Sequence, residues 1–522
     1  MIVLELTAAI DAAGTLRTFY VSEGAFTTGP ADTPAHISFV PALLDPGSLG
    51  VSAYANLSTT TPLAGGGSSG GGTTGGEGQL QVGEISLANT DGQFDSWLNY
   101  GFDGRPVVIR NGQPGAAYPA GFKLLFSGTI ENIDANWKTL ILKLRDKQFM
   151  FTQPVLTNTY LGNNALPRGV EGVPADLMGQ VKPKIFGSVF SISPKLVNTS
   201  FFTYQVSDGP VSAINAVYDR GSLLTFGADY ATVDSLQFSG PTAGTYNTCL
   251  ALGYFQTGSQ PAGTVTADVV QGATIAKRTV AQILALLGVA AGLTSVEISS
   301  TDVAAMDAIN SATVGVFIDG TTTFQSVMDQ VSASIGAWYG FDPAGVLRMG
   351  VLTNPSGVPK LSLFDYDFSE NIERRAARDS NIPAWKVTTN YAKIWTVQTD
   401  LAGSVPAATV SRLALPNATA IQLDATIKQQ FKLATEIVVD GLLVDQAAAT
   451  TEASRQLALQ KVRRDIFDVP ISVDQMPATP LVFLDVIQLT VNRFGLNGGK
   501  LFRLIGITYQ LATRQIILTV WG

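Results

Sequence analysis

Apolar and polar residues alternate along most of the first 150 residues, as expected for strands with one buried face. The clearest case is the segment 139–145, in which Leu140, Leu142 and Leu144 share one face. Further strands are predicted at residues 2–6, 81–87, 106–110 and 122–126, and turns at Asp91-Gly92, Phe102-Asp103-Gly104 and Asn111-Gly112. Short strands separated by regular turns predict a β-sandwich or β-barrel.

In two later segments the spacing of the apolar residues changes to that of a helix. Residues 279–287 have apolar side chains at helical spacing behind Thr279, a candidate N-cap, and residues 323–335 repeat this pattern with Phe324, Val327, Met328, Val331 and Ile335. A strand follows at 346–351, which favours a small α+β unit.

The chain is long enough for three or four packed units. We predict an N-terminal β domain at 1–150, a second β-rich domain at 151–272, an α+β domain at 273–358 and a C-terminal β domain at 359–522. The last of these is expected to contain one helix at about 450–464 and to end on a strand, 515–521, that ties down the C-terminus.

A glycine-rich insert at 65–78 interrupts the first domain and is predicted to be a flexible loop at a hairpin tip, because it has no side chains that could form a core. It contains a G-x-S-x-G pattern at 66–70 and a G-x-G-x-x-G pattern at 70–75. A nucleophile elbow needs a strand before its serine and a helix after it, and a dinucleotide fingerprint must open a helix. Low complexity on both sides argues against either function.

The composition limits the possible chemistry. The chain has one cysteine, Cys249, and one histidine, His36, so an intrachain disulfide and a Cys/His zinc site are excluded. His36 is interpreted as a structural residue in an alternating strand, and Cys249 as a small buried hydrophobe. A glycosidase needs only two carboxylates, which 41 acidic residues cannot exclude, but their spacing points to no pair. We therefore expect no enzyme activity and no catalytic, cofactor-binding or metal-binding residues.

Charged residues make up only 14% of the chain, against about 25% in typical proteins. A surface with so few charged residues suits a protein that is packed in an assembly. The net charge is −8, and the densest basic run, Arg374, Arg375 and Arg378, is interpreted as a solvated face or an intersubunit ion pair rather than a DNA contact. The start of the chain lacks the basic segment of a signal peptide, and the apolar stretch 280–293 is too short to span a bilayer. We expect synthesis in a bacterial cytoplasm and no membrane segment.

Three groups of segments resemble the hub proteins of phage tails and baseplates. The first leads from 83–89 through Asp91-Gly92-Gln93-Phe94-Asp95 and 102–107 to the strand 125–130 and to 144–147. The second contains Lys182-Pro183-Lys184-Ile185-Phe186-Gly187 and 194–197, followed by 204–211 and 217–221. The third is the end of the chain, with 484–487, 493–496, 502–507 and 516–521. Together these segments extend from about residue 80 to the C-terminus. The glycine-rich insert and residues 290–320 have no counterpart.

The resemblance implies a mainly β fold with a minor α+β part, in which two barrels similar to the tail-tube fold carry smaller inserted domains. It implies a homotrimer at the tail tip of the virion, whose six barrels match a six-fold tube on one side and three-fold tip proteins on the other. The implied partners are the tail tube or distal tail protein, the tape measure protein, and tip or fibre proteins. DNA would pass through the channel without sequence-specific binding.

Two alternatives remain open at this point. The chain could be a receptor-binding tail fibre or other host-recognition protein, although the repeats or heptads typical of fibres are not evident. It could also be a tail-associated cell-wall or polysaccharide hydrolase.

Overall fold

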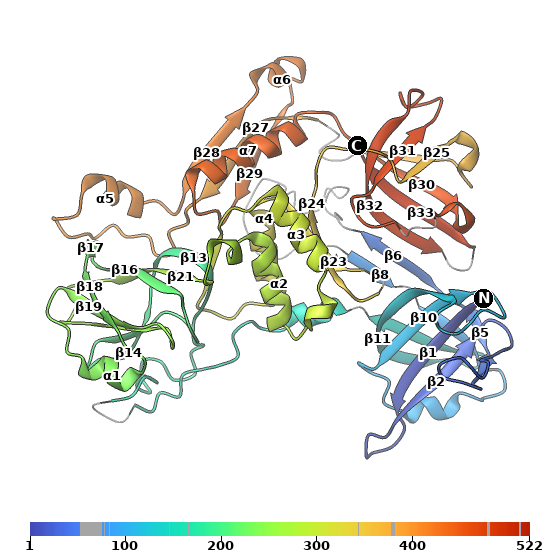
Figure 1. Ribbon diagram of the computed structural model, residues 1–522, viewed down its shortest axis with the longest axis horizontal. Coiled ribbons are helices and arrows are strands. Elements are labelled where there is room, and N and C mark those ends of the chain that lie inside the picture. The colour runs from blue at the N-terminus through green and yellow to red at the C-terminus, as the bar shows by residue number, and fades with distance from the viewer. Residues whose placement is uncertain are drawn as a thin grey trace.

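The computed structural model describes residues 1–52, 76–77, 79–82, 84–145, 147–164, 168–342, 344–376, 382–477, 481–510 and 513–522. Figure 1 shows β-sheets at both ends of the molecule and a group of helices near its middle. The predicted mainly β class with a minor helical part is confirmed. A closed barrel requires the first and last strands of a sheet to pair with each other. Among the described residues each sheet has two unjoined end strands, so the predicted pair of barrels stays a prediction.

A nine-stranded sheet occupies the N-terminal part of the chain, in the order β3-β4-β2-β1-β10-β11-β12-β9-β5. Its strands are β1 (Ile2–Ala9), β2 (Leu16–Ser22), β3 (Phe26–Thr27), β4 (Ser38–Pro41), β5 (Leu43–Asp45), β9 (Ile85–Ala88), β10 (Pro106–Gly112), β11 (Phe122–Ala135) and β12 (Thr139–Arg145). Leu140, Leu142 and Leu144 are all buried on one face of β12, as their alternation predicts.

Two five-stranded sheets follow and share one core. Their orders are β17-β16-β21-β13-β22 and β14-β15-β20-β19-β18. The strands are β13 (Lys184–Ile192), β14 (Lys195–Asn198), β15 (Thr203–Gln205), β16 (Ala213–Asp219), β17 (Ser222–Leu223), β18 (Thr225–Asp229), β19 (Thr245–Cys249), β20 (Tyr254–Thr257), β21 (Val265–Gln271) and β22 (Gly315–Ile318), with helix α1 (Val233–Phe238). Ile185, Val189, Tyr246 and Phe255 meet in the space between the two sheets.

The central helices are α2 (Val280–Ala290), α3 (Ser300–Ile309) and α4 (Phe324–Ala333), which lead into the hairpin of β23 (Ala337–Phe341) and β24 (Leu347–Val351). Thr279 caps α2 as predicted, since its hydroxyl accepts from the Gln282 amide at 3.2 Å. The apolar stripe predicted for α4 is buried. Helix α3 was not predicted, because it buries only Met306 and so has no apolar stripe.

An eight-stranded sheet forms the C-terminal part. Six of its strands follow the order β25-β31-β32-β33-β30-β26, and the other two are described below. These strands are β25 (Leu361–Phe364), β26 (Glu373–Ala376), β30 (Asp465–Ser472), β31 (Val486–Thr490), β32 (Lys500–Gln510) and β33 (Gln515–Trp521). The last strand, β33, pairs with both β30 and β32, and Trp521 is buried. The C-terminus is therefore tied down, as predicted.

A smaller sheet, in the order β28-β27-β29, stands at the top of the molecule in Figure 1. It consists of β27 (Ala384–Tyr391), β28 (Ala418–Leu423) and β29 (Thr435–Asp440), with α5 (Ala407–Leu413) and α6 (Ala425–Gln430) in its connections and α7 (Gln446–Gln460) packed against it. The helix predicted at 450–464 begins four residues earlier, because the Asp445 carboxylate accepts from the Ala447 amide and caps it there.

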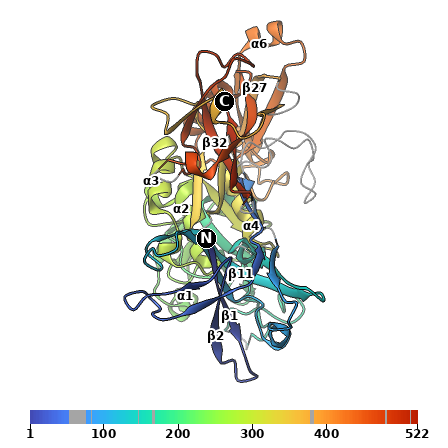
Figure 2. The same ribbon diagram turned by 90° about the vertical axis from the view of Figure 1, so that its right-hand side faces the viewer.

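Two strands from the first 100 residues belong to the C-terminal sheet. β6 (Ser48–Ser52) is antiparallel to β32, and β8 (Gln79–Val82) is antiparallel to β6. Both lie between the N-terminal and C-terminal sheets in Figure 1, and Figure 2 shows these sheets one above the other. The predicted hairpin around the glycine-rich insert therefore exists, but it extends the C-terminal sheet. Residues 53–75, which include most of the insert, lie outside the described residues.

The end of the glycine-rich segment is also paired. Gly76 and Glu77 form β7 (Gly76–Glu77), which runs parallel to β23 at Trp338 and Tyr339. The expectation that this segment is a flexible loop is wrong for these two residues, because their backbone completes the sheet of β23 and β24. The boundaries predicted for the four domains stay predictions.

Candidate functional site

The residues singled out in the sequence do not come together. His36 lies exposed in a turn, with a positive φ of 56°, and the strand begins only at Ser38. The expectation that His36 sits in an alternating strand is wrong, because a left-handed backbone cannot continue a strand. Cys249 ends β19 and is completely buried beside Tyr160 and Leu236. Burial raises the pKa of its thiol, so Cys249 is the small buried hydrophobe that was predicted.

The basic run forms ion pairs within the chain. Arg374 and Arg375 on β26 each lie 2.6 Å from an aspartate of the neighbouring strand β30, Asp465 and Asp468 respectively. These pairs neutralise part of the run, which agrees with a solvated face better than with a DNA contact. Arg378 and the glycine motifs at 66–70 and 70–75 lie outside the described residues.

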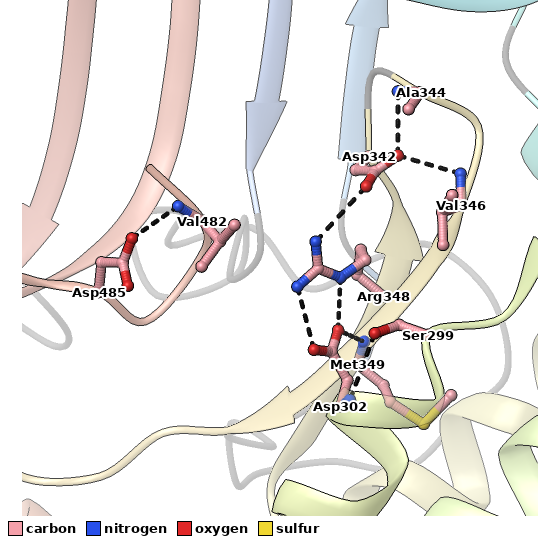
Figure 3. A network of polar contacts seen from close by, with 9 residues as sticks. All are labelled: Ser299, Asp302, Asp342, Ala344, Val346, Arg348, Met349, Val482 and Asp485. Atoms are coloured by element: carbon pink, nitrogen blue, oxygen red, sulfur yellow. Dashed lines mark hydrogen bonds and ion pairs between the residues drawn. The ribbon is translucent and has the colours of Figure 1, made fainter. Parts of the chain in front are cut away.

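The described residues contain no cluster of three or more histidine, cysteine, aspartate or glutamate side chains that could hold a metal ion. Two carboxylates do lie close to one cation, however. Asp302 and Asp342 both contact Arg348 on β24, and Figure 3 shows the three side chains converging. A pair of carboxylates is the minimum for glycosidase chemistry, so their surroundings decide what they can do.

Asp302 is positioned by the start of α3. The Ser299 hydroxyl accepts from the Asp302 amide at 3.3 Å and caps the helix, which turns the Asp302 carboxylate towards β24. Arg348 then donates to it with Nε at 2.5 Å and Nη2 at 3.0 Å, and the Met349 amide adds a contact at 3.4 Å. This bidentate geometry is the strongest that a guanidinium and a carboxylate can form. The hydrogen bond to Asp302 is the main cause of the raised pKa of Arg348.

Asp342 fixes the turn between β23 and β24. One of its oxygens accepts from the amides of Ala344 at 2.9 Å and Val346 at 3.0 Å, and the other lies 3.5 Å from Arg348 Nη1. All four carboxylate oxygens of Asp302 and Asp342 are thus engaged by donors of the chain. The arrangement fastens α3 to the β23–β24 hairpin.

A second buried network joins α7 to the central helices. The Glu452 side chain is completely buried, and its oxygens accept from Arg455 Nε at 2.9 Å, from Arg455 Nη2 at 2.6 Å, from Gln456 at 2.8 Å and from Asn310 at 2.9 Å. Arg455 also donates to the carbonyls of Ile335 at 2.7 Å and Leu352 at 3.0 Å. Four parts of the chain therefore meet at one ion pair.

Asp485, also drawn in Figure 3, joins two segments of the C-terminal sheet in a similar way. Its Oδ2 accepts from the Val482 amide at 2.7 Å and from Lys360 Nζ at 2.9 Å. Lys360 precedes β25 and Asp485 precedes β31, so this contact joins the beginnings of two paired strands. Like the two networks above, it holds structural elements together.

The exposed surface offers more for function than these networks do. The sheet β28-β27-β29 packs one face against α7, through Val387, Ile437, Val439, Ala453 and Leu457. On the opposite face the register places Thr388 between Ile421 of β28 and Val438 of β29, with Leu423 in the next row beside Lys386. Ile421, Leu423 and Val438 are 49%, 54% and 38% exposed.

This outer face is bounded by sheet edges. β28 and β29 are the two ends of the three-stranded order, and each has the unpaired backbone groups of an edge strand. Another edge strand is β18, in which every residue is exposed, including Phe226. Edge strands with exposed aliphatic and aromatic side chains are suited to pairing or packing with another chain.

Sequence reasoning missed both carboxylate networks. A Ser-x-x-Asp pattern at 299–302 and a Thr-x-x-Glu pattern at 294–297 mark helix starts, and either could have indicated that a helical turn begins there. The structure has a full capping box at Thr294 and Glu297, on the short 3-10 helix η5 (Ser295–Glu297). No local pattern could have identified Arg348 as the partner of Asp302.

No family model matches the chain, and no curated protein sequence is significantly similar. Among solved structures, the 43 kDa tail protein of prophage MuSo2 from Shewanella oneidensis is 11% identical, with 99% of this chain and 97% of that chain covered and a TM-score of 0.41. The tail protein from Neisseria meningitidis MC58 is 9% identical, with 99% and 96% covered and a TM-score of 0.42. A chain of the native gene transfer agent virion is 15% identical, with 70% and 91% covered and a TM-score of 0.43. Likeness at this level assigns neither a family nor an activity.

Among the described residues, none of the helices combines the length and the apolar character needed to cross a bilayer.

Proposed function

We propose that this protein is a structural component of a phage-like virion, a tail-tip hub whose subunits form a closed, trimeric ring. The observation that carries the proposal is the outer face of β28-β27-β29, where Ile421, Leu423 and Val438 are exposed on a sheet with two free edges. A closed ring buries such faces and edges between neighbouring copies. The sequence segments that resemble tail hub proteins support the same assignment.

The ring would join the tail tube, or a distal tail protein, to the baseplate and to tip or fibre proteins. It would frame the channel through which the tape measure protein and the DNA leave. The net charge of −8 suits a channel that DNA passes without binding. The two predicted barrels of each subunit, and the four predicted domains, belong to this proposal. So does its place in the virion, after synthesis in the bacterial cytoplasm.

The tight internal networks support a mechanical role rather than an enzymatic one. Asp302, Asp342 and Glu452 all use their carboxylates to hold elements of the same chain together. A subunit that transmits force between a tube and a baseplate needs such fixed junctions, because loosely attached domains would move independently.

The experiment is to image the purified chain by negative-stain microscopy and to compare two variants. In Ile421→Asp/Val438→Asp, charges replace aliphatic side chains on the outer face, and we expect monomers in place of three-fold rings. Val358→Asp is the matched control, since Val358 is 91% exposed and lies outside that sheet; it should form rings like the wild type. Rings that survive the double substitution would show that another surface forms the interface.

A further inference from the structure

Two asparagines of the sequence, Asn111 and Asn497, are followed directly by glycine. An Asn-Gly pair is chemically labile, because glycine has no side chain to keep its backbone nitrogen away from the side-chain amide of the preceding asparagine. The fold places the two pairs in different surroundings. Asn111 belongs to strand β10, whereas Asn497 lies in the connection between β31 and β32. The surroundings therefore decide which asparagine can react.

The pair at Asn497 is open to solvent. Asn497 and Gly498 are both exposed, and they are the two central residues of a turn that the Gly499 amide closes by donating to the Leu496 carbonyl at 3.0 Å. Among the described residues, neither the Asn497 side chain nor the Gly498 amide has a hydrogen-bond partner. A Cβ added at Gly498 would meet nothing within 4 Å. No neighbouring group therefore shields the side-chain amide or the backbone nitrogen.

This turn is held firmly at both ends. Leu496 is buried in the core of the C-terminal sheet. Gly499 has a φ of +76°, and a Cβ added there would lie 2.6 Å from Gln488 Nε2, so only glycine fits. The two reactive residues thus project from a fixed base and contribute nothing to the core, which means that a chemical change in them leaves the fold intact.

The pair at Asn111 is shielded by the N-terminal sheet. Asn111 is paired with Ile2 on one side and with Lys123 on the other. Its Oδ1 accepts from the Met1 nitrogen at 3.3 Å, and the Gly112 amide donates to the Met1 carbonyl at 3.0 Å. A backbone nitrogen whose proton is held in such a bond does not attack a neighbouring carbon. Reaction at Asn111 therefore requires local opening of the sheet.

We propose that Asn497 is a site of spontaneous deamidation in the folded protein, and that Asn111 keeps its amide. The Gly498 nitrogen loses its proton to hydroxide and attacks Cγ of Asn497. The new N–Cγ bond forms, the Cγ–Nδ2 bond breaks, and the amide leaves as ammonia after taking a proton from water. Water then opens the cyclic imide at either of its carbonyls, which leaves aspartate or isoaspartate at this position.

The product changes the surface of the protein. Both products add a negative charge to the exposed turn, and isoaspartate also adds a methylene group to the backbone. An exposed isoaspartyl carboxylate is the substrate of one class of enzyme, the protein carboxyl methyltransferases, so the turn would become a site for such a partner. The proposal does not depend on the assignment of the protein as a ring subunit, because both residues belong to one turn of one chain.

The test uses the tryptic peptides of the full chain. Cleavage after arginine and lysine releases peptides 494–500 and 111–123, and each contains a single asparagine. The folded chain is incubated in mildly alkaline buffer and digested at intervals, and mass spectrometry measures the conversion of amide to acid. We expect Asn497 to convert about tenfold faster than Asn111 or more, because Asn111 reacts only in molecules whose sheet has opened. In concentrated urea both asparagines should convert at similar rates.

A pair of glycine variants tests the proposed attack. Gly498→Ala places a methyl group beside the attacking nitrogen and should slow the conversion of Asn497 several-fold. Gly403→Ala is the matched control, since a Cβ added at Gly403 also meets nothing within 4 Å, and it should convert like the wild type. Methylation of the incubated chain by a protein carboxyl methyltransferase would identify isoaspartate.

Three results would overturn the proposal. They are the absence of conversion at Asn497 in the folded chain, equal rates at Asn497 and Asn111 in the folded chain, and unchanged conversion in Gly498→Ala. The first two comparisons need only the wild type, so they decide the matter even where the alanine variant fails to fold.

Discussion

Glu452 and Arg455 lie three residues apart on α7, and the Arg455 guanidinium is 2.6 Å from a carboxylate that has no exposed surface. Their partners lie just after the ends of α3, α4 and β24: the Asn310 side chain and the carbonyls of Ile335 and Leu352. This pair therefore determines how α7, and the small sheet packed on it, attach to the middle of the molecule.

Arg455→Met should lower the free energy of unfolding by about 3–5 kcal/mol, because it leaves a buried carboxylate without its counter-ion. The double variant Glu452→Leu/Arg455→Met removes both charges and should recover part of that loss. Urea denaturation of the single and double variants measures both effects. A single variant within 1 kcal/mol of the wild type would contradict the importance given to this junction.

Arg348 should tolerate substitution poorly for a related reason. Arg348→Met removes both bonds to Asp302 and the contact to Asp342, and we expect a loss of about 2–3 kcal/mol in unfolding free energy. Arg348→Lys keeps the charge but not the bidentate geometry. It should therefore recover less than half of the unfolding free energy that Arg348→Met loses. Full recovery with lysine would show that charge alone matters. Chemical denaturation of the three proteins distinguishes these outcomes.

Glu297 predicts a pH dependence of stability. Lys147, in the short 3-10 helix η3 (Lys147–Thr152), and then the Thr294 side chain and amide hold the pKa of Glu297 at about 2, below its usual 4.5. Because the folded-state pKa is the lower one, the stabilisation is complete above about pH 5 and is lost as the pH falls towards 2.

The variant Glu297→Gln removes this dependence. At pH 7 it should be less stable than the wild type, and the difference should shrink steadily as the pH falls below 5. Urea midpoints of both proteins between pH 7 and 3 measure this difference. A difference that stays constant over that range would show that Glu297 is not stabilised in its ionised form.

Removal of residues 516–522 should abolish soluble expression. β33 lies between β30 and β32, so its loss exposes two strand edges and the core around Phe502 and Val469. Trp521→Phe keeps the buried aromatic contact and should remain soluble. Soluble, cooperatively unfolding protein from the truncation would contradict the central place of this strand.

The sequence predicts the local elements of this fold better than their pairing. Alternation identifies β12 through Leu140 and Leu142, and helical spacing identifies α4, because each pattern reflects a face that is buried. The predicted start of α7, at about residue 450, is four residues late, because Asp445 caps the helix before Gln446. Long-range contacts could not be predicted. Nothing in 48–52 indicates pairing with Gly506 and its neighbours near the other end of the sequence.

The candidate sites could not be predicted from the sequence either, because they too depend on long-range contacts. Asp302 and Arg348 are unremarkable in the sequence, and they meet only because α3 packs beside β24. His36, which was interpreted as a structural residue in a strand, lies in an exposed turn.

The mass of the purified chain in solution tests the central claim most directly. A trimeric ring has a mass of about 165 kDa, three times the 55.0 kDa of one chain. Native mass spectrometry or light scattering at micromolar concentration should find this species in the wild type and a 55.0 kDa species in Ile421→Asp/Val438→Asp. A wild-type chain that stays at 55.0 kDa at high concentration would contradict the account of this protein as a ring subunit.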